Sequence, residues 1–312
     1  MLKHLIIFIL VLFFPMAVRA EWQNAVQNPQ MQIVPQDAFK ILDANISISN
    51  DKLSVAYTMQ SWLNGDVLVQ FDLLPYAWFG DVVIYLDRSF SELDVSLNEK
   101  KIEYNKRYNA LIGNKDITDD LEKSGISPTI LNDYSKWIQD SADNRKQYAD
   151  MLAKNYMINV PDHQYIPRWW VHPYYWFSFS GKSDVPFKLE YQHTILWGAD
   201  SFKVSEMKKN EKSIFASLLQ IKPDEFQKIF SKLGLKDDAY CKLTQTRIPW
   251  VNIAKLYPIK NISIQLVNDS KKPQIIFLRI SDKYIYSTEK TLSINLTDIA
   301  PQEDLWVVIF SQ

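Results

Sequence analysis

Residues 168–198, RWWVHPYYWFSFSGKSDVPFKLEYQHTILWG, are the part of this chain around which the rest is organised. The segment 169–179 is rich in aromatic residues, which favour a buried strand. Gly181 and its polar neighbours indicate a turn. After the turn, apolar and polar residues alternate over 185–192, as they do in a strand with one buried face. The stretch therefore predicts two strands joined by a short turn.

These two strands are expected to pair with each other as a hairpin. A turn centred on Gly181 and Lys182 places Trp176 opposite Phe187 and fixes the register along both strands. Aromatic side chains bury about 150–250 Å² each, so the aromatic face of the hairpin is expected in the core of a β-sandwich. The alternative is a platform that binds sugar or peptide. The residues of this face are Trp170, His172, Tyr174, Trp176, Phe187, Leu189, Tyr191 and His193.

The first 20 residues have the features of a cleaved secretory signal peptide. Lys3 and His4 form a basic start, and the apolar run 5–14 is too short to cross a bilayer as a helix. Small residues ending at Ala20 offer a cleavage site. We therefore expect a periplasmic mature chain of 312 − 20 = 292 residues without a stable membrane span.

Charge and cysteine content narrow the possible classes of partner. Removing Lys3 and Arg19 with the leader changes the formal net charge from −1 to −1 − 2 = −3, and no basic patch remains. Nucleic acid is therefore not expected as a partner. Cys241 is the single cysteine, so no internal disulfide can form. We expect its thiol to be buried as a small apolar group; the alternatives are a reactive thiol or a bridge between two chains.

The periodicity along the chain predicts a mainly β protein with helical insertions (α+β). An irregular arm is expected over 21–37. A helix is predicted at 118–123, ending at Gly125, and a helical connector over 199–234. Alternating segments predict the strands 41–49, 52–61, 66–74, 82–86, 262–267, 274–280, 292–296 and 305–310. The pattern also continues over 93–104, with a turn expected at 97–100.

This order of elements predicts an antiparallel β-sandwich with a helical insertion packed on the sheet. The expected divisions are a signal peptide at 1–20 and an N-terminal β-sandwich domain at 21–200, with its insertion at about 113–156. A helical connector and a C-terminal β-rich domain follow at 201–312.

The chain contains none of the common catalytic or cofactor motifs. The seven glycines form neither a GxGxxG nor a Walker pattern, and HExxH and GxSxG are both missing. No catalytic residue and no cofactor are predicted, which favours a protein that is not an enzyme.

Three histidines are weak candidates for a metal site. In the hairpin register, His172 and His193 are diagonal neighbours, and His163 precedes the hairpin. A metal site normally brings three or four ligands and a polar second shell, whereas this face is aromatic. We therefore expect no metal here, and the histidines are interpreted as core or interface residues that hydrogen-bond to tyrosine or backbone.

Several segments resemble a family of exported bacterial proteins known as domain of unknown function 4424. The most specific is Trp169-x-Val171 followed by Tyr174-Tyr175-Trp176 and closing at Trp197-Gly198. Further similarity lies in residues 46–49, 53–57, 69–75, 116–126, 240–241 and 258–261. The resemblance implies an exported, β-rich protein and supplies no catalytic residues.

The chain departs from the family pattern in two places. It has Tyr191-x-His193 where relatives usually have His-x-Tyr, and residues 277–279 lack the second cysteine found in relatives. The disulfide that the resemblance suggests is therefore not available to Cys241.

Three functions remain open from the sequence. The favoured one is a non-enzymatic interaction or binding module of the cell envelope, with an envelope protein or polysaccharide as its partner. The second is a carbohydrate or peptidoglycan binder that uses exposed aromatic side chains, with Trp78, Trp169 and Trp250 as candidates. The third is a metal-dependent hydrolase built on the three histidines. The sequence does not indicate the ligand or the oligomeric state.

Overall fold

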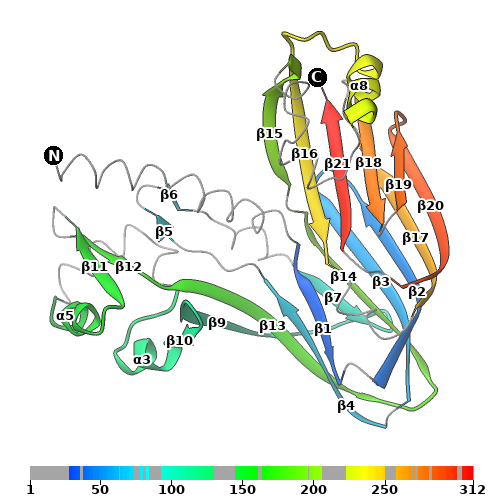
Figure 1. The fold of residues 1–312 in the computed structure, drawn as a ribbon. Helices are drawn as coiled ribbons and strands as arrows, with labels where there is room; N and C mark the ends of the chain where they lie inside the picture. The colour runs from blue at the N-terminus through cyan, green and yellow to red at the C-terminus, as the bar shows by residue number, and fades with distance from the viewer. Residues whose placement is uncertain are drawn as a thin grey trace, which may run out of the picture.

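The structure, a computed structural model, describes residues 28–35, 38–62, 64–73, 78–79, 82–83, 93–129, 145–160, 164–195, 197–205, 223–249, 258–268, 270, 273–280, 283–300 and 304–311. It is built mainly from antiparallel β-sheets, which confirms the predicted fold class (Figure 1). Three large sheets carry most of the strands, and a small helical lobe extends from one of them.

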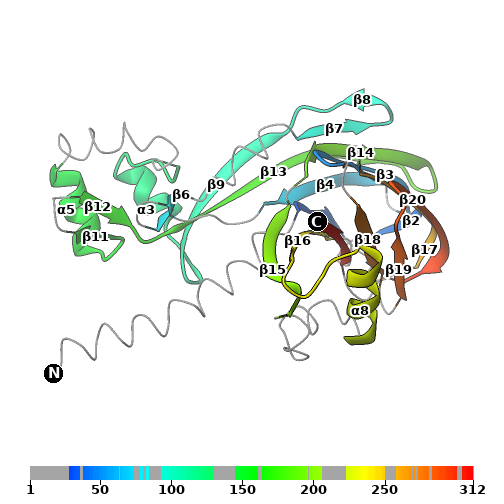
Figure 2. The ribbon, with the colours of Figure 1, turned by 90° about the horizontal axis from the view of Figure 1, so that it is seen from above.

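The first large sheet, here called the arm sheet, has the strand order β1-β4-β13-β9-β10. It extends from the body of the molecule to the lobe, with β9 and β13 reaching the lobe (Figure 2). Its strands are β1 (Gln30–Val34), β4 (Gly65–Asp72), β9 (Asn105–Ile112), β10 (Lys115–Asp116) and β13 (Trp170–Gly181).

The second is a seven-stranded sheet with the order β20-β17-β2-β3-β14-β7-β8, in which β17 and β2 are parallel. Its strands are β2 (Phe39–Ile48), β3 (Lys52–Ser61), β7 (Asp94–Leu97), β8 (Lys100–Lys101), β14 (Pro186–Thr194), β17 (Ile259–Val267) and β20 (Thr291–Ile299).

The third, the C-terminal sheet, has the order β15-β16-β21-β18-β19. Its strands are β15 (Gly198–Lys203), β16 (Tyr240–Ile248), β18 (Gln274–Ile280), β19 (Lys283–Ser287) and β21 (Leu305–Ser311). Two short two-stranded sheets pair β5 (Trp78–Phe79) with β6 (Val82–Val83), and β11 (Met157–Val160) with β12 (Gln164–Pro167).

All three large sheets contribute to one main hydrophobic core. It contains Phe71 and Tyr175 from the arm sheet, Leu189 from the seven-stranded sheet, and Leu278 and Val307 from the C-terminal sheet. The predicted division between residues 200 and 201 is therefore not a division between separate cores. Strands β17 and β20, from the predicted C-terminal domain, complete the sheet that begins with β2 and β3.

The predicted hairpin does not form, although both of its strands do. Strand β13 pairs with β4 and β9, whereas β14 pairs with β3 and β7. The two strands face each other across the core, where the rings of Phe179 and Phe187 lie 5.1 Å apart. We call this arrangement, in which consecutive strands belong to different sheets, an arch. Backbone donors of the turn explain it: Ser183 N donates to Asn64 Oδ1 and Asp184 N to Ser61 O, both at 2.8 Å. The turn is thus bound to the β3–β4 connection.

The arch also reverses the predicted faces of β13. Residues Val171, Tyr175 and Phe177 are buried, while Tyr174 and Trp176 lie half-buried on the outward face. The prediction for β14 is confirmed, because Phe187, Leu189, Tyr191 and His193 all point into the protein. Two apolar strands can satisfy their pattern across a core as well as side by side, so alternation alone could not choose between the two arrangements.

The helical insertion packs on the far ends of β9 and β13 and forms a second core. It includes α3 (Thr118–Lys123) and α5 (Arg145–Ala153), whose buried side chains Leu121 and Met151 join Trp169. Helix α3 has its predicted bounds and is followed by Gly125, whose φ of +70° suits the residue that ends a helix.

Two segments differ from their predicted secondary structure. The predicted irregular arm contains β1, which pairs with β4, and the start of the predicted helical connector is β15. Later in that connector, α8 (Pro223–Lys232) is present as expected, and Gly234 follows it with a φ of +66°. Cys241 is fully buried in a third core beneath α8, where burial raises its pKa to about 11. Among the described helices, none combines the length and apolar composition needed to cross a membrane.

A polar hollow on the seven-stranded sheet

The outward face of the seven-stranded sheet carries mostly polar side chains in two rows that cross five strands, and the side chains over β2 and β3 are short. Because side chains alternate between faces, every second residue of each strand joins this surface. The pairing registers align the residues from β17 to β7. One row consists of Ser263, Asn45, Ala56, Glu190 and Ser96, and the other of Gln265, Ser47, Ser54, Gln192 and Asp94.

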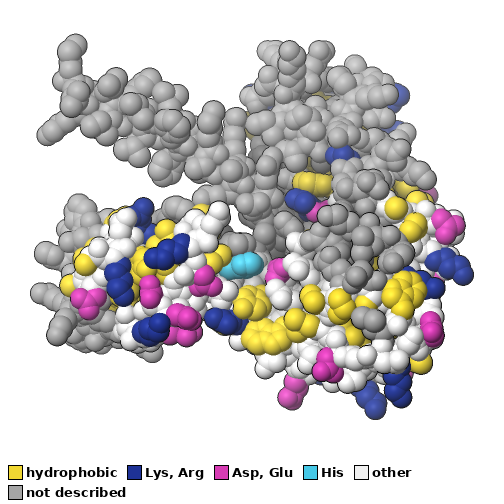
Figure 3. Space-filling model, turned by 60° about the horizontal axis from the view of Figure 1, so that its bottom comes forward, with side chains coloured by type: hydrophobic (Ala, Val, Ile, Leu, Met, Phe, Trp, Pro, Cys, Tyr) yellow, Lys and Arg dark blue, Asp and Glu magenta, His cyan; other side chains and the backbone are white. Residues whose placement is uncertain are grey.

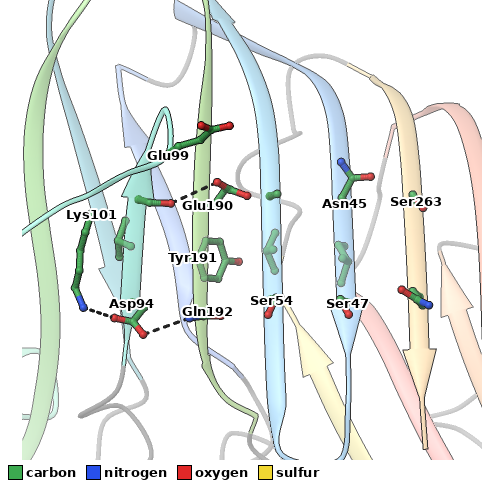
Figure 4. A pocket seen from close by; sticks show the side chains of 16 residues that line it. Asn45, Ser47, Ser54, Asp94, Glu99, Lys101, Glu190, Tyr191, Gln192 and Ser263 are labelled. Carbon is green, nitrogen blue, oxygen red and sulfur yellow. Dashed lines mark hydrogen bonds and ion pairs between the residues drawn. The ribbon is translucent and has the colours of Figure 1, made fainter.

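The shortness of these side chains leaves a hollow of about 650 Å³ above the sheet (Figure 4). Serine, alanine and asparagine occupy its middle, over β2 and β3, where longer side chains would fill the space. The hollow therefore presents hydroxyl and amide groups without a charged group at its centre. Charges lie on the side formed by β14 and β7.

The charged side of the hollow is organised by the turn between β7 and β8. Asn98 and Glu99 have φ of 48° and 68°, which makes the tight turn that returns Lys101 beside Asp94. Lys101 Nζ donates to Asp94 Oδ1 at 2.7 Å, and Gln192 Nε2 donates to Asp94 Oδ2 at 3.3 Å. These donors, Lys101 first, lower the pKa of Asp94, so its carboxyl group is ionised at neutral pH.

The second carboxylate of the hollow, Glu190, is also matched by a cation. Lys188 Nζ lies 2.9 Å from Glu190 Oε1, and this contact raises the pKa of Lys188. Ser96 Oγ donates to Glu190 Oε2 at 3.5 Å. Two carboxylates engaged in this way can accept hydrogen bonds from a ligand, whereas an acid catalyst needs a carboxyl group whose pKa is raised.

A smaller hollow of about 370 Å³ continues the surface past Asp94 and Gln192. His193 lines it with a side chain that is only 1 % exposed. The imidazole stacks on Tyr191, with ring centroids 6.3 Å apart, and its Nδ1 lies 2.7 Å from Thr194 O. Burial lowers the pKa of His193 to about 4, so this side chain is neutral at pH 7.

The structure separates the histidines that the sequence suggested as a metal cluster. His193 is buried on β14, while His172 lies half-buried on the outward face of β13 in the arm sheet. They are not cross-strand neighbours, because the arch places their strands in different sheets. His163 lies outside the described residues. Within the described part of the chain, no group of three metal-ligating side chains comes together.

The candidate binding tryptophans do not form an exposed surface in the described structure. Trp169 is fully buried, and its Nε1 donates to Pro128 O at 3.0 Å. Because Trp169 is buried in the lobe core, the prediction that it is an exposed binding residue is wrong. The side chain of Trp78 and the whole of Trp250 lie outside the described residues.

An aromatic row does lie outward on β13, at residues that the sequence reasoning placed in the core. The ring of Tyr174 lies 6.3 Å from that of His172 and 5.5 Å from that of Trp176. Beside this row, Asp72 accepts hydrogen bonds from Gln32 and Gln70. On the lower side of the molecule, hydrophobic side chains gather next to a histidine (Figure 3).

Sequence reasoning missed the polar hollow, although a signal was present. The outward positions of β2 and β17 are short and mostly uncharged, and the segment Asn-Ile-Ser-Ile occurs in both strands, at 45–48 and 261–264. Such positions read as ordinary solvent-facing residues when each strand is considered alone. They are recognisable as one polar surface only when the pairing of five strands aligns them.

Comparison with known proteins gives a family and distant likeness to solved structures. None of the curated proteins compared with the chain matches it. A solved structure of a candidate nutrient-binding protein from Legionella pneumophila is similar at 11 % sequence identity and a TM-score of 0.42, over 91 % of this chain and 70 % of that one. The model of the family "Domain of unknown function (DUF4424)" matches residues 23–308. The chain belongs to this family.

Proposed function

We propose that this chain is a non-enzymatic binding module of the cell envelope, and that the polar hollow binds an uncharged, hydroxyl-rich ligand of the glycan class. The observation that carries this proposal is the pair of polar rows, which align hydroxyls and amides over five strands. The proposed location in the periplasm rests on the leader at 1–20. Mass spectrometry of the mature protein should therefore show a chain that begins at Glu21.

The size and chemistry of the hollow suit such a ligand. Its volume of about 650 Å³ lies within the range of about 300–1,000 Å³ that is usual for small-molecule sites. Serine, asparagine and glutamine can both donate and accept hydrogen bonds, as sugar hydroxyls do. Two of the three carboxylates that line its edge, Asp94 and Glu190, are each paired with a lysine, so most of the negative charge there is matched and a strongly charged ligand is not favoured.

A substitution that fills the hollow tests the proposal. Ser54→Tyr places a large ring in the middle of one polar row, on a strand where tyrosine is favoured. The mature protein would be screened on an array of defined oligosaccharides that includes peptidoglycan fragments, and the strongest binder would be titrated by calorimetry. We expect Ser54→Tyr to weaken binding at least tenfold, equivalent to about 1.4 kcal/mol or more.

Thr58→Tyr is the matched control, because Thr58 lies on the same face of β3 but does not line the hollow. It should bind as the wild type does. A wild-type protein that binds nothing on the array, or equal weakening by both substitutions, would refute the proposed site.

The outward aromatic row of β13 supports a second candidate, a glycan platform on the arm sheet. Its motivation is the contact between the rings of Tyr174 and Trp176, beside the carboxylate of Asp72. This candidate predicts that Trp176→Ala, and not Ser54→Tyr, abolishes binding.

A further inference from the structure

Strand β20 differs from the other edge strands of the three large sheets. Edge strands attract other strands, and proteins usually protect them by shortness, charge or proline. At the opposite edge of the seven-stranded sheet, β8 has two residues, both lysine, and β10 is equally short. Proline follows β1, and lysine occurs in β15 and β19. Strand β20 has nine residues, and its positions 291–297 carry no charge and no proline.

Strand β20 is also an edge strand among the described residues. In the part of the chain that the structure describes, it pairs with β17 alone. Thr291, Ser293, Asn295 and Thr297 are exposed on the polar face, while Leu292 and Leu296 are only partly buried at the margin of the main core. A strand added here would gain backbone hydrogen bonds and cover these two leucines.

The sequence of this edge is complementary to itself in the antiparallel direction. If two copies of β20 pair about Ile294, Leu292 lies opposite Leu296, Ser293 opposite Asn295, and Thr291 opposite Thr297. Just beyond these pairs, Lys290 at one end of one copy and Asp298 at the other end of the second copy carry opposite charges and would lie near each other. Apolar residues thus meet apolar ones, polar residues meet polar ones, and opposite charges meet at both ends, which is the pattern that stabilises cross-strand pairs.

We propose that the chain forms a twofold homodimer through β20, which joins the two seven-stranded sheets into one. A twofold contact requires a surface that complements itself, and the alternating palindrome of β20 meets this requirement. A peptide of unrelated sequence would not need the edge to be palindromic, so a second copy is the occupant that the sequence favours.

The dimer would also lengthen the polar surface. Asn295 lies beside Ser263 and Ser293 beside Gln265, so both polar rows reach β20 and cross six strands. At strand spacings of about 4.8 Å, each row spans roughly 24 Å. In the proposed register, the row that ends at Ser293 in one copy continues into the row that begins at Asn295 in the other. Both hollows would then open on the same face of the joined sheet.

A disulfide experiment tests the register. Ser293→Cys and Asn295→Cys would be made in separate proteins, since the native Cys241 is buried. Residues 293 and 295 of opposite copies would lie within the Cα separation of about 4.4–6.8 Å that a disulfide needs. Diagonal neighbours lie about 7–8 Å apart, so neither variant should cross-link efficiently with itself. We expect the covalent dimer to form chiefly after the two variants are mixed and oxidised. Equal cross-linking of each variant alone, or none in the mixture, would overturn the register.

A charge experiment tests the dimer itself by analytical ultracentrifugation over a concentration series. The wild type is expected to be dimeric. Ser293→Lys/Asn295→Lys places lysine opposite lysine twice and should give a monomer. Ser293→Lys/Asn295→Glu changes the same exposed positions but places opposite charges together, so it should remain dimeric at low salt. A monomeric wild type, or the same oligomeric state for both double variants, would overturn the proposal.

Discussion

Strands β13 and β14 follow each other in the chain, yet they build opposite sides of the molecule. β13 turns Val171, Tyr175 and Phe177 inward and displays Tyr174 and Trp176. In contrast, β14 turns Leu189 and Tyr191 inward and displays polar residues. β13 joins the arm sheet to the lobe, and β14 forms the charged side of the hollow. The difference shows that the most aromatic strand is not the one that carries the hollow.

The largest expected effect is a difference in stability between alanine substitutions at two adjacent residues of β13, Tyr175 and Trp176. Tyr175 is 1 % exposed and stacks on Tyr104 at 5.1 Å, so Tyr175→Ala should lower the free energy of unfolding by about 3–5 kcal/mol, as other large-to-small core changes do. Trp176→Ala removes a half-buried ring on the outward face and should cost about 1 kcal/mol. Urea denaturation measures both. If Trp176→Ala lowered the free energy of unfolding more than Tyr175→Ala does, the face of β13 that carries Trp176 would be the buried one, as the sequence predicted.

The burial of His193 on β14 should make the stability of the protein depend on pH. Burial lowers the pKa of His193 from 6.5 to about 4, so the unfolded chain binds more protons than the folded chain between these values. Stability from this group is complete above about pH 6.5 and is lost as the pH falls toward 4. Between pH 7 and pH 5, the expected loss is about 2 kcal/mol.

Denaturation at both pH values checks this expectation with matched variants. His193→Gln should remove the loss between pH 7 and pH 5, whereas His172→Gln, on the outward face of β13, should retain it. A wild-type protein that is equally stable at both pH values would show that the His193 imidazole is not excluded from water.

A small effect is also expected outside both strands, at the single thiol of the C-terminal sheet. Cys241 is fully buried and packs beneath α8 as a small apolar side chain. Cys241→Ala should cost no more than about 1–2 kcal/mol, and reducing agent should leave the melting temperature unchanged. Loss of folding in this variant would mean that the thiol has a role beyond packing.

Local patterns in the sequence predicted the individual strands and helices well, but they predicted poorly which strands pair with each other. The alternation in β14, the helix α3 and its closing Gly125 depend on neighbouring residues, and these predictions are confirmed. The choice between a hairpin and an arch depends on contacts from Asn64 and Ser61, more than a hundred positions away along the chain. No periodicity within 168–198 contains that information.

The hollow could not be predicted for a related reason. Its two rows bring together five strands from both ends of the chain, including the parallel pair β2 and β17. Each outward serine or asparagine is unremarkable in its own strand. Only the registers convert them into one surface, and registers between distant strands are set by the packing of the whole core.

A single titration compares the hollow of the seven-stranded sheet, probed at Ser54, with the outward face of β13, probed at Trp176. The wild type, Ser54→Tyr and Trp176→Ala would be titrated with the oligosaccharide that binds the wild type best. We expect Ser54→Tyr to lose at least tenfold in affinity, because its ring occupies the hollow, and Trp176→Ala to bind like the wild type. The opposite result, with binding lost in Trp176→Ala and retained in Ser54→Tyr, would contradict the hollow as the ligand site and assign binding to the aromatic row of β13.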